Sequence, residues 1–164
     1  PSTQGNPNRL DEKKMLIGVS GSINVESENE STNDTRVGFE WALLYHKWYF
    51  AAEAYWMNVG FTKRQKINEH YNYVGGYIQG GYFVAPRVQL AARYDIMNRN
   101  STTKDGLLNM PAVGVNYFFK GCNLKLQAMY QYTGRTGHAN QLDRDNDNLG
   151  LATHSATVQL QYAF

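Results

Sequence analysis

The chain has 164 residues with a formal net charge of +2, and 42% of its residues are hydrophobic. The length is sufficient for one domain, and the small basic excess excludes a strongly cationic nucleic-acid-binding protein. No run approaches the roughly 18 consecutive apolar residues of a membrane-spanning helix, which excludes a helical membrane protein. A membrane β-barrel is compatible with the composition, because its strands are apolar on one face only.

Side chains that alternate between apolar and polar recur along the chain, and this pattern predicts about eight antiparallel strands in an all-β fold. In chain order, the predicted strands span residues 14–25, 35–45, 48–58, 73–84, 87–97, 110–119, 123–132 and 153–164. The last one shows the pattern most clearly: Val158, Leu160 and Tyr162 share one face, and Gln159 and Gln161 share the other.

Two features of the predicted faces distinguish a membrane barrel from a soluble sheet. Aromatic residues gather near the ends of the apolar faces, as in the girdles at the two membrane–water interfaces. The predicted girdle consists of Tyr45, Trp48, Trp56, Tyr82, Tyr94, Tyr117, Phe119, Tyr132, Tyr162 and Phe164. The opposite faces carry charges that a dry core could not accommodate but a polar lumen could. The candidates for lining that lumen are Arg36, Glu40, Glu53, Arg87, Arg93, Asp95 and Lys125.

The connections between the predicted strands alternate between short and long. Short connections lie at residues 46–47, 85–86 and 120–122, and long ones at about 26–34, 59–71, 98–108 and 134–152. Outer-membrane barrels have short periplasmic turns and longer outside loops. We therefore expect residues 14–164 to form a transmembrane β-barrel in the bacterial outer membrane. Both termini are then periplasmic, and residues 1–13 are a periplasmic lead-in or a segment between strands. Because the chain begins at Pro1 without an initiator Met or a signal peptide, we expect a processed form or a fragment.

Residues 77–94 read YIQGGYFVAPRVQLAARY, and residues 113–127 read VGVNYFFKGCNLKLQ. Both segments resemble the late strands of the phosphate-selective porin O and P family, and the resemblance extends more loosely over residues 35–164. It implies an outer-membrane channel for small ions and solutes, trimeric in the best-known members, whose barrels have about twice as many strands. The chain is thus expected to be the C-terminal half of such a porin or a shortened relative. The family's constriction loops are not found here, so no anion-binding residue is carried over.

Two functions remain open at this point. In the first, the complete barrel is a porin that small ions and solutes cross passively, with an anion preference, phosphate included, left open. Its basic lumen candidates could form a track for anions, or they could pair with the acidic candidates, which we favour because both signs occur. In the second, the eight strands close into a small barrel filled by side chains, with a structural or partner-binding role in an envelope complex.

Other sites receive little support from the sequence. No nucleophile elbow, P-loop or dinucleotide motif occurs, so we expect neither an enzyme nor a cofactor. The metal candidate is a set of alternating aspartates that resembles the start of a calcium loop, Asp143, Asp145 and Asp147. Asn148 and His154 stand where an EF-hand requires Gly and Glu, so a polar loop is favoured. Expected partners are outer-membrane lipid and lipopolysaccharide, barrel-assembly machinery that recognises the terminal strand, and further copies in a homotrimer or another envelope protein. Nucleic acid is not expected.

Overall fold

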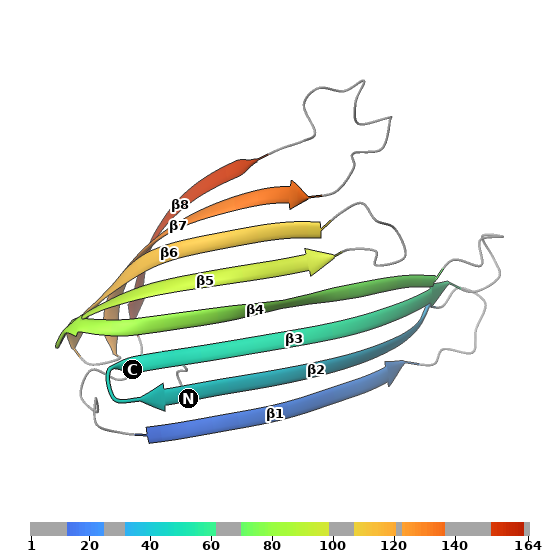
Figure 1. The fold of residues 1–164 in the computed structure, drawn as a ribbon, viewed down its shortest axis with the longest axis horizontal. Coiled ribbons are helices and arrows are strands. Elements are labelled where there is room, and N and C mark those ends of the chain that lie inside the picture. Colours follow the sequence, from blue (N-terminus) through green and yellow to red (C-terminus); the bar gives the residue numbers. More distant parts are fainter. Residues whose placement is uncertain are drawn as a thin grey trace.

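The computed structural model describes residues 13–24, 32–61, 70–98, 107–120, 123–136 and 152–162. Within these ranges the chain forms one antiparallel sheet of eight strands, each paired with the next in sequence (Figure 1). The strands are β1 (Lys13–Asn24), β2 (Thr32–Tyr45), β3 (Trp48–Phe61), β4 (His70–Ala85), β5 (Val88–Asn98), β6 (Leu107–Lys120), β7 (Leu124–Thr136) and β8 (Thr153–Tyr162). No helix in the described part of the chain is long and apolar enough to cross a membrane. The predicted all-β, antiparallel fold is confirmed.

Every predicted strand is present, and several extend beyond the apolar run that indicated them. The β3–β4 ladder, for example, continues past the pair formed by Asn58 and Asn72. The Asn58 amide donates a hydrogen bond of 2.6 Å to the Asn72 side-chain oxygen, so polar side chains support this part of the ladder. Some predicted boundaries are wrong: Arg87 and Asn123 lie in turns rather than in strands, and Ala85 ends β4 rather than lying in the connection. Residues 1–12 and 163–164, which include Phe164, lie outside the described residues.

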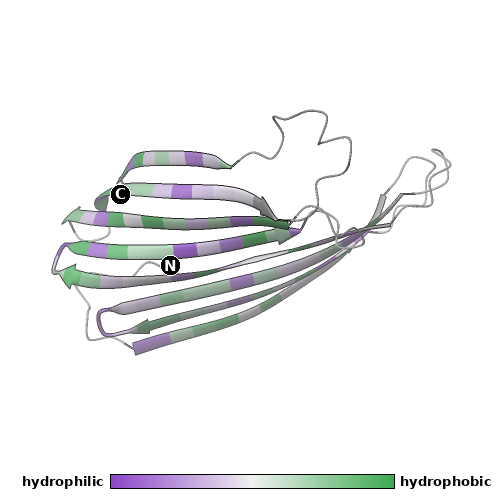
Figure 2. Cartoon of the chain, turned by 45° about the horizontal axis from the view of Figure 1, so that its top comes forward, coloured by the Kyte–Doolittle hydropathy of each residue, from purple (hydrophilic) through white to green (hydrophobic). Residues whose placement is uncertain are grey.

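Over much of the sheet the register keeps apolar residues beside apolar residues, although toward the long connections polar residues join this face, as where Val74 pairs with Asn98. Ile78 pairs with Ala52 on one side and with Tyr94 on the other. We call this side the apolar face, and its large side chains are exposed, with 65% exposure for Ile78 and 73% for Val158. Figure 2 shows hydrophobic and hydrophilic residues interspersed along the strands of the curved sheet. No described residue covers this face, so large apolar side chains exposed over the whole sheet are expected to lie against an apolar environment.

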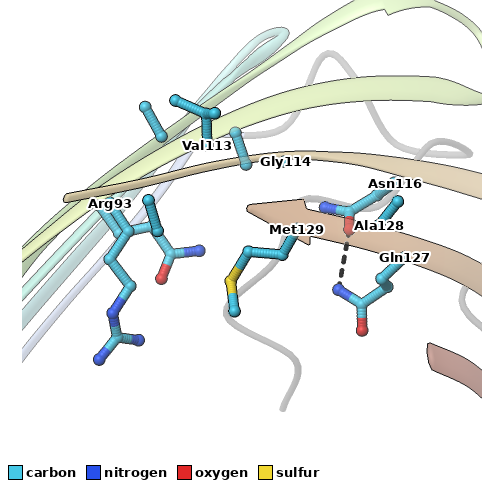
Figure 3. A pocket seen from close by; sticks show the side chains of 11 residues that line it. Arg93, Val113, Gly114, Asn116, Gln127, Ala128 and Met129 are labelled. Atoms are coloured by element: carbon cyan, nitrogen blue, oxygen red, sulfur yellow. Dashed lines mark hydrogen bonds between the residues drawn. The ribbon is translucent and has the colours of Figure 1, made fainter. Parts of the chain in front are cut away.

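The opposite side, which we call the polar face, lies on the concave side of the sheet (Figures 1 and 3). Its side chains crowd one another at the end where the strands are joined by short turns. We call this group the inner cluster; its members are at most 7% exposed and comprise Tyr49, Phe83, Gln89, Asn116, Phe118 and Lys125. The Phe83 and Phe118 rings lie 5.5 Å apart between centroids. The densest packing of the described residues is therefore on the polar face.

Two similar irregularities hold the inner cluster in place. The register shifts between Phe83 and Ala85 in the β4–β5 pair, and between Phe118 and Lys120 in the β6–β7 pair. The Phe83 amide donates to the Lys47 carbonyl at 3.0 Å, and the Phe118 amide donates to the Arg87 carbonyl at 2.9 Å. Each bulge thus connects the end of one hairpin to the turn of the preceding one. Bulges of this kind re-aim side chains at barrel rims.

Two glycines on the apolar face of β4 give a matched test of this packing. A Cβ atom at Gly76 would lie 2.5 Å from the Glu53 carbonyl oxygen, whereas one at Gly80 would lie no closer than 3.5 Å to the Phe50 ring. We expect Gly76→Ala to lower the free energy of unfolding by about 1–3 kcal/mol, because backbone must move. Gly80→Ala is expected to raise it by about 0.4–1 kcal/mol through the lost flexibility of the unfolded chain.

Urea unfolding of the two variants in lipid vesicles measures these free energies. Both new methyl groups face the same environment from the same strand, so the contribution of lipid contact cancels in the comparison. Equal effects of the two substitutions would contradict the close approach of β3 and β4 at Gly76.

Candidate functional site

The polar face carries most of the charged residues that the sequence predicts to line a lumen. Six of the seven candidates lie on it: Arg36, Glu40, Glu53, Arg93, Asp95 and Lys125. The seventh, Arg87, lies in the β4–β5 turn. The structure therefore brings the six together on one side of the sheet, from strands β2, β3, β5 and β7. That this side lines a lumen stays a prediction.

Among the polar-face side chains that the structure describes, Arg36 and Arg93 are each held by an aspartate on their own strand. Arg93 Nε lies 2.9 and 2.8 Å from the two carboxylate oxygens of Asp95, and Arg93 Nη2 lies 2.6 Å from Oδ1. Arg36 Nη2 lies 2.6 Å from Asp34 Oδ2. Residues two apart on a strand share a face, so the pairs form without distortion of the backbone. Asp34 is not among the predicted lumen residues, although its position two residues before Arg36 on the same strand indicates such a pair.

A cross-strand network surrounds Arg93. Its guanidinium carbon lies 3.8 Å from the centroid of the Tyr77 ring, and the Glu53 carboxylate lies near the Tyr77 hydroxyl. Glu53, Tyr77 and Asp95 occupy successive strands in register, so these contacts join β3, β4 and β5. Sequence analysis did not single out Tyr77, because its role depends on which residues the register places beside it.

Glu40 and Glu53 are directly opposite each other on β2 and β3, which would be unfavourable for two carboxylates pointing at each other. Glycine on the neighbouring strand relieves this arrangement. A Cβ atom at Gly18 would collide with Glu40 Oε1, so the Glu40 side chain extends over β1 where a glycine leaves room. The Glu53 carboxylate lies toward Tyr77 on the other side. The two acids therefore diverge.

Two hollows open on the polar face on either side of Arg93. One, of about 170 Å³, is lined by Gln79, Ala91, Arg93, Gly114, Gln127 and Met129 among others (Figure 3). Figure 3 shows the Arg93 guanidinium of β5 and the Met129 thioether and Gln127 amide of β7 pointing to the same side of the sheet. The other hollow, of about 250 Å³, is lined by Glu53, Tyr55, Tyr77, Asp95 and Met110 together with Arg93. Small residues at the base of the hollows and polar side chains around them leave space for water or a small solute.

A chain of amides connects the first hollow with the inner cluster. Asn116 Nδ2 donates to Gln89 Oε1 at 2.9 Å, and Gln127 Nε2 donates to Asn116 Oδ1 at 2.8 Å. Gln89 is 1% exposed, and its Nε2 has no hydrogen-bond partner among the described residues. The amides thereby fix one another's orientation across β5, β6 and β7.

The charges of the polar-face side chains that the structure describes balance. These side chains include four basic residues, Lys14, Arg36, Arg93 and Lys125, and four acidic residues, Asp34, Glu40, Glu53 and Asp95. Arg93 keeps 38% of its side chain exposed while Asp95 binds it. This surface can hydrate a pathway, but aspartates neutralise the charges of Arg36 and Arg93.

The predicted girdle residues separate into two groups on the apolar face. Tyr45, Trp48, Tyr82, Tyr117, Phe119 and Tyr162 lie toward the short turns, where Trp48 and Tyr82 are in ring contact at 4.5 Å. Trp56, Tyr94 and Tyr132 lie further toward the long connections, and there aromatic residues meet polar partners. The Tyr94 hydroxyl donates to Asn109 Oδ1 at 2.7 Å, and the Tyr132 ring lies 5.2 Å from that of His154.

Within the described ranges, no three His, Cys, Asp or Glu side chains come together in a way that could hold a metal ion. The alternating aspartates Asp143, Asp145 and Asp147 lie outside the described residues.

Comparison with known proteins gives one match. A family model described as phosphate-selective porin O and P matches residues 1–164. Neither the curated proteins nor the solved structures give a match to the chain.

Proposed function

The chain belongs to the phosphate-selective porin O and P family, and on this premise we propose that it forms the wall of a passive outer-membrane channel for small ions and solutes. The observation that carries the proposal is the separation of the two faces over eight strands in register. Exposed apolar side chains on one face suit lipid, and charged and amide side chains around two hollows on the other suit water.

We propose that strands beyond these eight close the barrel. Among the described residues, β1 and β8 each pair on one side only. In a membrane, every backbone amide and carbonyl needs a partner, so an unpaired edge within lipid is not tolerated. Further strands, from the same protein or from another copy, would supply the partners. The alternation of short and long connections supports a periplasmic position for the short turns, and hence for both ends of this segment.

A preference for phosphate is the finer part of the proposal, and it rests on the family description. Arginine is the residue expected to bind phosphate, because its planar fork matches two phosphate oxygens. Arg36 and Arg93 are each compensated by an aspartate, so these strands add little net attraction for anions as they stand. We therefore assign any strong phosphate preference to residues other than Arg36 and Arg93.

Conductance across planar bilayers tests the channel. The full-length protein should produce discrete current steps that grow in proportion to salt concentration, as expected for passive flow through a water-filled pore. Membranes treated with the same detergent alone serve as the control. A purified, folded protein that produces no steps above this background would contradict the proposed function.

The second candidate, a small closed barrel without transport, is favoured by one observation. Phe83 and Phe118 on the polar face are 2% and 1% exposed, as expected where side chains fill an interior. Counting the strands of the complete assembly by solid-state NMR or cryo-electron microscopy separates the candidates. Eight strands around a filled interior would support the structural role, and a larger barrel would support the channel.

A further inference from the structure

Three basic side chains at the short-turn end of the sheet have no acidic partner among the residues that the structure describes. Lys13 begins β1, Lys47 lies in the β2–β3 turn and Arg87 lies in the β4–β5 turn; we call them the basic rim. All three are exposed, and in the described part of the chain none forms an ion pair with a carboxylate. On the polar face, by contrast, Arg36 and Arg93 are each paired with an aspartate. Within the described ranges, the basic rim therefore carries positive charge with no carboxylate paired to it.

The backbone holds the basic rim along one edge of the sheet. The carbonyls of Lys47 and Arg87 accept the hydrogen bonds from Phe83 and Phe118, which fixes each turn against the next hairpin. Lys13 is in register with Tyr45, two residues before Lys47. Every described acidic residue lies away from this edge. The nearest along the strands, Glu40 and Glu53, are each five residues from the β2–β3 turn, which corresponds to about 17 Å.

Aromatic side chains on the apolar face lie directly behind the basic rim. Trp48 contacts Tyr82 with ring centroids 4.5 Å apart, and Tyr117 contacts Phe119 at 4.8 Å. The Lys13 ammonium lies 4.8 Å from the centroid of the Tyr45 ring. Tyr and Trp concentrate at the headgroup level of a bilayer, and cations just beyond them reach lipid phosphates.

We propose that the basic rim binds the phosphate groups of anionic phospholipids in the leaflet that faces the short turns. The proposal rests on the membrane location in the proposed function, but not on transport. Lys13 shares the apolar face with Tyr45, so it faces the surrounding lipid. A soluble anion in the lumen would instead meet residues of the polar face. Each basic residue near an anionic lipid surface contributes attraction that decays within a Debye length.

Native mass spectrometry of the full-length protein from mixed micelles of phosphatidylglycerol and phosphatidylcholine tests this proposal. We expect the protein to retain phosphatidylglycerol preferentially. The triple variant Lys13→Gln, Lys47→Gln, Arg87→Gln should retain roughly ten-fold less phosphatidylglycerol. Each positive charge that is removed weakens the attraction to the anionic lipid. The charge-preserving variant Lys13→Arg, Lys47→Arg, Arg87→Lys should behave as the unmodified protein does and shows that the loss does not arise from misfolding.

A second control removes the same amount of charge from the connections that follow β3 and β5, with Lys63→Gln, Arg64→Gln and Lys104→Gln. It should leave phosphatidylglycerol retention unchanged. Equal retention by the rim variant and the unmodified protein, or displacement of the lipid by equimolar inorganic phosphate, would overturn the proposal. Absence of conductance would count against the channel and leave the lipid preference standing, so the two failures are distinguishable.

Discussion

Replacing Asp95 by asparagine is expected to release Arg93 and to make the chloride current through the channel about ten-fold more sensitive to phosphate. In the folded chain, the Asp95 carboxylate accepts hydrogen bonds from Nε and from one terminal nitrogen of Arg93. The asparagine amide cannot balance the guanidinium charge, yet it has nearly the same size as the carboxylate. The exposed part of Arg93 beside the hollows would then face a dissolved anion with its full charge. Charge-assisted contacts of a guanidinium with phosphate are strong enough for an effect of this size.

The measurement is a phosphate titration of the chloride current in planar bilayers. The phosphate concentration that halves the current should be lower for Asp95→Asn than for the unmodified protein. Glu40→Gln is the matched control, because it removes the same charge from the same face without releasing an arginine. It should shift the reversal potential toward anions but leave phosphate sensitivity unchanged. Equal phosphate sensitivity of the two variants would show that general charge, and not the release of Arg93, is responsible.

The Asp34–Arg36 pair shows the same compensation of an arginine by an aspartate on its own strand. Two arginines on different strands each have an aspartate two residues away on the same strand. An anion that passes such a pair meets a dipole rather than a net charge, and its attraction falls off quickly with distance. A second variant, Asp34→Asn, should therefore act in the same direction as Asp95→Asn and add to it, since the two pairs share no residue.

Much of the fold could be predicted from the sequence because a strand repeats every two residues. A shift of one residue would turn each apolar side chain to the polar face, so the alternation fixes both the strands and their faces. Short connections then fix which strands are neighbours. The prediction was least accurate at strand ends, as at Arg87, where the backbone ladder rather than side-chain polarity sets the boundary.

The contacts of the candidate site were harder to predict, because they depend on the register between strands. The sequence identified Arg93 and Asp95 but not Tyr77, which the β4–β5 register places directly opposite Asp95. The bulges after Phe83 and Phe118 also lack a clear signal, since each inserts one residue into an otherwise regular alternation. Residue type thus predicts a face, and the register decides which side chains meet on it.

The inner cluster should dominate the stability of this sheet, and Phe118→Ala should lower the free energy of unfolding by about 3–5 kcal/mol, as for other buried Phe residues. The Phe118 side chain is 1% exposed, and its ring contacts that of Phe83 at 5.5 Å. The neighbouring strand places Lys125 opposite it, and the adjacent amides cannot collapse into the space without losing hydrogen bonds. The cavity would therefore persist, which adds to the lost apolar contact.

Phe119→Ala is the matched control, since Phe119 is the next residue, lies on the apolar face and is 46% exposed. Its contacts with the surroundings can be taken over by lipid, so less than half the cost of Phe118→Ala is expected. Denaturant unfolding in vesicles, followed by tryptophan fluorescence, measures both values. A larger cost at Phe119 would show that lipid contact, rather than packing on the concave side, stabilises the sheet. We expect the larger loss of stability at Phe118 because its backbone amide also holds the preceding turn, as does that of Phe83. Loss of the ring would leave this connection without side-chain packing.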